Sequence, residues 1–168
     1  MMLWFTNFNA KKHLQGLREK ALNIYNRLVE RVLPLAQGGG LQIADEFELR
    51  FDLLVFFVAG IMFQLRQSDS ELAETLWAVT FEGLDHSLRQ RGVQDLGMRK
   101  KMRKIYADAA GRLQAYHQAM QQQDDLLLRR AVGRNVLNGA EAQDPRVGII
   151  LEHLQMVIDE FQGEDLKK

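Results

Sequence analysis

Apolar residues recur at steps of three and four along most of this chain, which is the spacing of one face of an α-helix. The first such stretch runs from about Lys11 to Leu33. Pro34 and the glycines at 38–40 follow it and predict the end of the helix. Residues 1–10 are expected to form a separate N-terminal segment. The apolar stripe of this first helix consists of Leu14, Leu17, Ala21, Ile24, Leu28 and Val32.

A second stretch, from about residue 46 to residue 66, is apolar on nearly all sides. A helix of this kind is buried on most of its surface, so we expect it to be the central helix of the fold. Asp45 is its predicted N-cap, with Glu48 as the capping-box partner. Arg50 and Asp52 are polar exceptions that need a structural ion pair or cap, because buried charges require partners. The apolar run is too short to span a membrane, which needs about 20 residues.

The rest of the chain shows the same helical periodicity. Ser68 and Glu71 predict a capping box for a third helix, which ends near Arg91 with Gly92 as its C′ residue. Three more helices are predicted, at about 96–120, 126–137 and 145–161, the last one capped by Asp144 and started by Pro145.

No segment alternates as a β-strand does. The predicted fold class is therefore all-α: a single domain of about six helices, residues 11–162, packed around the central helix 46–66. Residues 163–168 are expected to be a disordered tail.

Composition narrows the possible functions. Hydrophobic residues make up 46% of the chain and charged residues 26%, as in ordinary globular proteins. The formal net charge is zero, so bulk charge does not favour nucleic acid, and an electrostatic partner requires a local patch. The absence of cysteine excludes disulfides, thiolate metal sites and a cysteine nucleophile.

The sequence offers little catalytic chemistry. Its four histidines lie outside any HExxH motif, and Glu82 with His86 is a single i, i+4 pair, so no metal site and no cofactor are expected. An enzyme acting on an apolar ligand, in a pocket around Phe56, Phe57 and Met62, would need acidic metal-binding clusters. Only Asp124-Asp125 approaches such a cluster. We therefore predict no enzyme and no small-molecule substrate.

A concentration of positive charge lies between the third and fourth predicted helices, opposed by Asp95 alone. One interpretation is a solvated helix face, with Arg89 paired to Asp85 and Lys104 to Asp108. The other is a docking surface for RNA, acidic lipid or an acidic protein. The basic residues are Arg89, Arg91, Arg99, Lys100, Lys101, Arg103 and Lys104.

Several sequence blocks around this cluster occur in an order that resembles the ubiquinol–cytochrome c chaperone family. They are Leu88-Arg89-Gln90-Arg91-Gly92-Val93-Gln94-Asp95-Leu96, Lys100-Lys101-Met102 and Gly111-Arg112, preceded by Tyr25, Asp45 and Arg50-Phe51-Asp52 and followed by Arg134-Asn135-Val136. The resemblance covers roughly residues 25–137.

The resemblance implies a non-enzymatic assembly chaperone that binds newly made cytochrome b, or another subunit of the cytochrome bc1 complex. Its further partners would be a second small assembly factor, the ribosome and the surface of the inner membrane. We expect a bacterial member in the cytoplasm beside that membrane, or the matrix side if mitochondrial. The alternative is an RNA- or ribosome-binding helical module that uses residues 89–104.

The basic cluster and the resemblance together give two groups of candidate residues. Partner binding is expected of Arg89, Arg91, Asp95, Arg99, Lys100, Lys101, Arg103, Lys104 and Arg112. A structural role is expected of Tyr25, Asp45, Arg50, Phe51, Asp52, Leu88, Gly92, Val93, Leu96, Met102 and Gly111.

Overall fold

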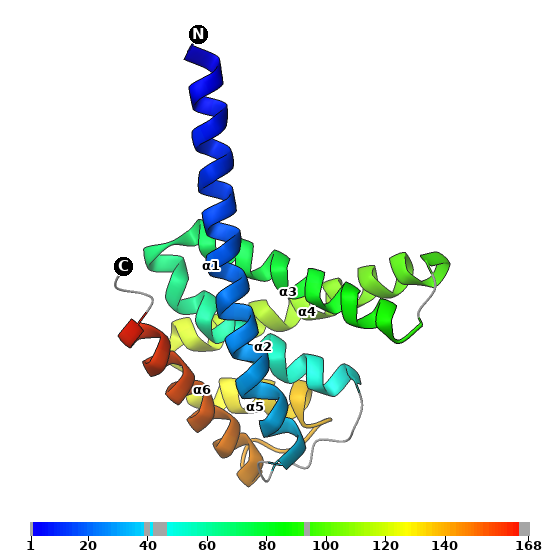
Figure 1. Ribbon diagram of the computed structural model, residues 1–168. Coiled ribbons are helices and arrows are strands. Elements are labelled where there is room, and N and C mark those ends of the chain that lie inside the picture. The colour runs from blue at the N-terminus through cyan, green and yellow to red at the C-terminus, as the bar shows by residue number, and fades with distance from the viewer. Residues whose placement is uncertain (1, 39–40, 42–46, 93–94, 165–168) are drawn as a thin grey trace.

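The computed structural model describes residues 2–38, 41, 47–92 and 95–164, with the side chains of all of these except residues 2–10, 38, 95–96 and 164. The described chain folds into six helices and contains no strand, which confirms the predicted all-α class (Figure 1). The helices are α1 (Met2–Gly38), α2 (Phe47–Ser68), α3 (Ser70–Gln90), α4 (Asp95–Gln122), α5 (Asp125–Val136) and α6 (Pro145–Glu164).

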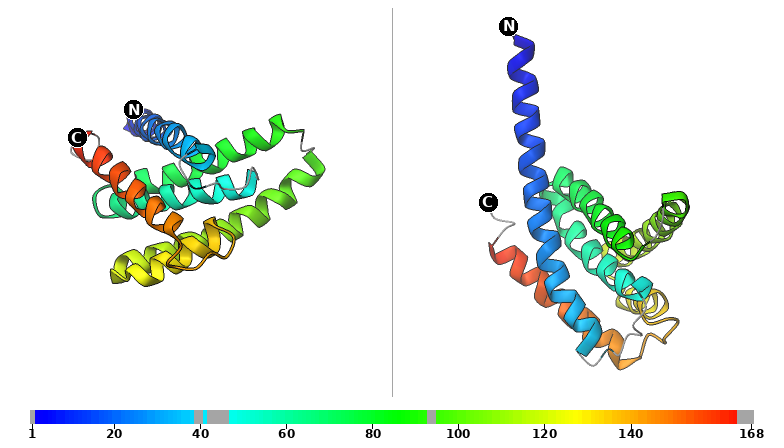
Figure 2. Two further views of the ribbon diagram at one scale, coloured as in Figure 1. Left: turned by 90° about the horizontal axis from the view of Figure 1, so that it is seen from below. Right: turned by 45° about the vertical axis from the view of Figure 1, so that its right-hand side comes forward.

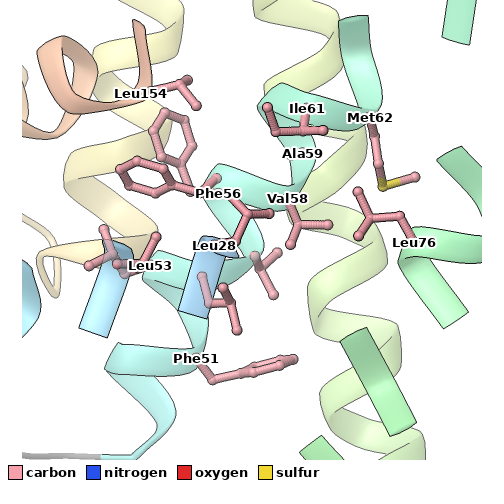
Figure 3. Packing of buried hydrophobic residues seen from close by; sticks show 14 of the residues in the cluster. Leu28, Phe51, Leu53, Phe56, Val58, Ala59, Ile61, Met62, Leu76 and Leu154 are labelled. Carbon is pink, nitrogen blue, oxygen red and sulfur yellow. The ribbon is translucent and has the colours of Figure 1, made fainter. Parts of the chain in front are cut away.

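Helix α2 lies at the centre and packs against all five other helices. Every residue from Phe51 to Met62 is buried, as expected for a helix that is apolar on nearly all sides. Figure 3 shows this packing, with Leu154 of α6 and Leu76 of α3 on opposite sides of α2. Gly60 permits the contact with α6, because a Cβ atom there would lie 2.5 Å from Leu154 Cδ1.

Helix α1 is longer than the sequence pattern predicted at both ends. It begins at Met2, and its N-terminal part extends beyond the rest of the molecule (Figure 1). It also continues through Pro34, which lacks an N–H group and crowds the carbonyl of the preceding turn. Leu35 and Ala36 are buried in the core directly after the proline, and this packing stabilises a last turn that local rules disfavour.

The helix caps agree with the sequence in part. Gly92 has a φ of +82° and ends α3 as predicted, and Asp144 Oδ1 accepts a hydrogen bond from the backbone N–H of Arg146 in the first turn of α6. The predicted cap of α3 is wrong. Asp69, not Ser68, accepts from the Leu72 N–H at 3.0 Å, because Asp69 is the single non-helical residue between α2 and α3.

Two of the other predicted features cannot be compared with the structure. Asp45, the expected cap of α2, and residues 165–168 of the expected tail lie outside the described residues, whereas residues 163–164 of that tail belong to α6.

Helices α3 and α4 form a V. They converge at the turn that joins them and then separate, with α2 lying in the opening between them (Figure 2, left). Both arms pack on α2, α3 packs on α1 as well, and the two arms pack only a little on each other. The closed end of the V therefore projects from the side of the molecule, and it contains the basic residues singled out in the sequence.

Candidate partner-binding surface

The basic tip, defined as Arg89, Arg91, Arg99, Lys100, Lys101, Arg103 and Lys104, comprises the end of α3 and the start of α4. The tip projects from the body of the molecule (Figure 1). All of these side chains are exposed except that of Lys101, which is half-buried. The two segments meet because Gly92 adopts the left-handed conformation that reverses the chain after α3. The predicted Val93 lies outside the described residues, as do the side chains of Asp95 and Leu96.

Most of the tip cations already have partners within the chain. Arg89 Nε donates to Asp85 Oδ2 at 2.7 Å and Lys104 Nζ donates to Asp108 Oδ2 at 3.3 Å, which confirms both predicted i, i+4 pairs. Two more of the tip cations, Lys101 and Arg91, contact the start of α2. Lys101 Nζ lies 3.6 Å from Glu48 Oε1, and the Arg91 guanidinium lies 4.6 Å from the centre of the Phe47 ring.

Three cations remain on the outer face of α4. Arg99, Lys100 and Arg103 are exposed and form no ion pair with any side chain that the structure describes. Their spacing places them opposite Met98, Met102 and Ile105, which face the body. Among the described side chains, the cations without an acidic partner thus form a smaller patch than the sequence cluster, and we refer to these three residues as the free basic face.

Arg112 lies further along α4 and has a different environment. Its Nη1 donates to Oδ1 of Asp52, which is only 6% exposed. Arg112 thus provides the partner that the buried carboxylate of α2 requires. The sequence grouped this arginine with the partner-binding residues, but the structure places it between helices.

An apolar groove opens between α1, α2 and α3, and the sequence reasoning did not predict it. Its volume is about 270 Å³. It brings together Tyr25, Arg50 and Phe51, which the family pattern suggested were structural, with Arg91 of the basic tip. The remaining lining residues are Val29, Leu33, Phe47, Leu54, Leu84, Ser87 and Gln90. The signal in the sequence was the i, i+4, i+8 spacing of Tyr25, Val29 and Leu33 on α1.

The close approach of α1 to α3 beside this groove depends on a glycine. A Cβ atom at Gly83 would lie 2.2 Å from the Tyr25 hydroxyl oxygen, so a larger residue would displace the tyrosine ring. The ring is half-buried, and this burial raises the pKa of Tyr25 above its ordinary value.

A second, more polar crevice of about 140 Å³ lies on the other side of the α2 start, between α2 and α4. Phe47 and Phe51 contribute to its wall as they do to the apolar groove. Its charges balance: three acidic and three basic side chains line it, namely Glu48, Asp52, Asp108, Lys101, Lys104 and Arg112. The groove, in contrast, has Arg50 and Arg91 and no acidic residue among its described lining.

The described part of the structure contains no group of side chains arranged to bind a metal ion. No three His, Asp or Glu side chains there gather as metal ligands. Glu82 accepts both hydrogen bonds of the Arg18 guanidinium, at 2.8 and 2.6 Å, so it is not directed at His86. Phe56, Phe57 and Met62 are packed in the core. Among the described helices, none combines the length and hydropathy that a membrane span needs.

Comparison with known proteins gives two matches of different kinds. A family model described as ubiquinol-cytochrome C chaperone matches residues 40–157, more than two thirds of the chain. The crystal structure of the Cbp3 homolog from Brucella abortus aligns with a TM-score of 0.66 over 95% of this chain and 87% of that chain, at 24% sequence identity. At this identity the structural match shows a shared fold. No curated protein matches the chain by sequence.

Proposed function

The chain belongs to the ubiquinol–cytochrome c chaperone family, and we propose that it binds newly made cytochrome b and holds this subunit until it enters the cytochrome bc1 complex. The family match over residues 40–157 supports this proposal. The match supports a general role in bc1 assembly. The more specific part of the proposal is that the client is cytochrome b. The action is non-enzymatic and takes place in the cytoplasm, at the surface of the inner membrane.

The free basic face is the proposed electrostatic contact. This face lies at the projecting closed end of the V that α3 and α4 form, and no described acid neutralises Arg99, Lys100 or Arg103 there. Exposed charges of one sign attract an oppositely charged surface over a Debye length of about 8–10 Å, and they mainly accelerate association. Acidic segments of the client, a second small assembly factor or anionic lipid beside the client would all be attracted to this face.

The RNA- or ribosome-binding alternative has less support. Four of the seven tip cations contact side chains of the chain itself, which leaves three to contact phosphates. Binding to RNA would fall steeply with salt and would not require the client.

Deletion of the gene tests the function directly. The amount of assembled bc1 complex should fall, while cytochrome b is still translated. Native gel electrophoresis of membranes measures the complex, and pulse labelling measures cytochrome b synthesis. A normal amount of bc1 complex in the deletion strain would refute the proposed function.

Charge reversal tests the contact surface. The triple variant Arg99→Glu, Lys100→Glu, Arg103→Glu should weaken client capture by about tenfold or more, because three attractive charges become repulsive. The control reverses three exposed cations elsewhere: Lys12, Lys20 and Arg130. Both proteins should keep a wild-type circular dichroism spectrum. Equal loss of capture in the control would show that the tip has no special role.

A further inference from the structure

The apolar groove is lined by faces of three helices and has room for about two large apolar side chains. Each of its three walls is a helix face that repeats at helical spacing, as in Tyr25, Val29 and Leu33 of α1. The eight residue steps from Tyr25 to Leu33 rise by about 12 Å, which equals roughly two turns of helix. A helix that lies along a groove of this length can insert two apolar side chains that are one turn apart.

The residues that line the groove indicate which side chains a bound helix must carry. Most of the wall is apolar, and aromatic side chains such as Phe47 and Phe51 lie along α2. The described lining includes Arg91 and no acid, while its other arginine, Arg50, already has an interaction partner. Arg91, at the end of α3, lies over the Phe47 ring and forms no ion pair with a described residue. An apolar helix face that ends in a carboxylate complements this surface in both packing and charge.

We propose that this groove binds an amphipathic helical segment of the client, with two apolar side chains about one turn apart followed by an acidic residue that pairs with Arg91. The inference rests on the proposed function, since the client supplies the segment. Arg91 belongs both to the groove and to the basic tip, so one bound segment can extend from the groove onto the basic tip. Insertion of a helix into a groove is a common mode of peptide recognition.

A pair of synthetic peptides tests the proposed chemistry on the full chain. Each is a fluorescent helix of about 14 residues, roughly four turns, with two leucines one turn apart. One carries glutamate and the other lysine one turn further along the same face. Fluorescence anisotropy should show the acidic peptide binding about tenfold more tightly. Arg91→Glu should reverse this order, whereas Arg130→Glu, an exposed control on α5, should not.

Two results of this experiment would overturn the inference. One is equal affinity for the two peptides, or an order that Arg91→Glu leaves unchanged. The other is binding of phosphatidylglycerol vesicles by the wild type and not by Leu33→Glu, with neither peptide bound. That result would assign the groove to lipid.

A matched pair of variants on α1 tests the groove in cells. Leu33 lines the groove and is 37% exposed, whereas Leu14 is 63% exposed on the same helix and lies outside it. Leu33→Glu should lower the amount of assembled bc1 complex, and Leu14→Glu should not. Val29→Trp, which fills the groove without adding charge, should act as Leu33→Glu does if the fold is kept.

The groove and the function can fail separately. If the deletion strain loses bc1 complex while the folded variants at Leu33, Val29 and Arg91 assemble normal amounts, the groove inference is wrong and the chaperone function stands. If the deletion strain keeps its bc1 complex, the function itself is wrong.

Discussion

The basic side chains in the two halves of α4 differ in their exposure to solvent and in their partners. In the first half, Arg99, Lys100 and Arg103 are exposed and have no acidic partner among the described residues. In the second half, Arg112 bonds the buried Asp52 of α2, and the adjacent Tyr116 and His117 are buried with hydrogen-bond partners on other helices.

Solvation explains the difference. A charge inside a protein is stable only when a partner replaces the water that it has lost, so Arg112 and Asp52 must be considered as one unit. A charge at the projecting tip remains hydrated and needs no partner for folding. The outer face of the first half of α4 therefore remains hydrated, whereas Arg112 in the second half links α4 to the interior of α2.

The largest expected effect comes from breaking the interior pair. Arg112→Ala should lower the free energy of unfolding by about 3–5 kcal/mol, because it leaves the Asp52 carboxylate buried without its cation. Urea denaturation followed by circular dichroism measures the change. Lys104→Ala removes an exposed i, i+4 pair and should cost less than about 1 kcal/mol. Similar costs for the two variants would contradict the distinction between the halves.

A smaller effect is expected from removing one hydroxyl group in each half. The Tyr116 side chain is fully buried, and its oxygen accepts a hydrogen bond from Asn135 Nδ2 at 3.2 Å. Tyr116→Phe should destabilise the protein by about 1 kcal/mol. Tyr106 in the first half is 49% exposed, so Tyr106→Phe should be close to neutral in the same denaturation assay. The comparison fails if Tyr106→Phe costs more.

The smallest expected effect is a dependence of stability on pH that arises from His117. Burial lowers the pKa of His117 below the ordinary 6.5; its hydrogen bond to the Ala59 carbonyl opposes this, and nearby Arg66 lowers the pKa further. Nε2 donates to Ala59 at 2.9 Å while Nδ1 accepts from Arg66 at 3.1 Å, so the ring must be neutral to keep both bonds.

The sign follows from linkage. Below pH 6.5 the unfolded chain binds a proton at residue 117, whereas the folded chain does not, because the pKa of His117 is lower in the folded state. The free energy of unfolding should therefore decrease as the pH is lowered from 6.5, until the pH passes the folded pKa. Denaturation between about pH 7.5 and 5 measures the slope, since His ordinarily titrates near 6.5. His117→Gln should flatten it, because the substitution removes the buried titrating group. A wild-type slope in His117→Gln would contradict this assignment.

The errors in the sequence predictions have a common cause. Pro34 and the Ser68–Glu71 pattern were interpreted by local rules, but the burial of Leu35 and Ala36 continued α1, and the one-residue connection after Ser68 moved the cap to Asp69. Local propensity is a weak effect that packing readily overrides. The apolar groove was missed for a related reason. Its walls come from three separate helices. The periodicity of each helix does not indicate where the faces leave a gap when the helices pack together.

The sequence by itself determined the all-α class, the central position of α2 and the concentration of charge at the turn between α3 and α4. These features follow from helical periodicity and composition, which are local properties of the chain. The sequence also predicted the pairs of Arg89 with Asp85 and of Lys104 with Asp108. Only the tertiary structure decided the partners of Arg112 and Lys101. Arg112 and Asp52 are 60 positions apart, and Lys101 meets Glu48 across the same interface of α2 and α4. Whether a charge is available depends on its burial and its partner, and both depend on how distant helices pack together.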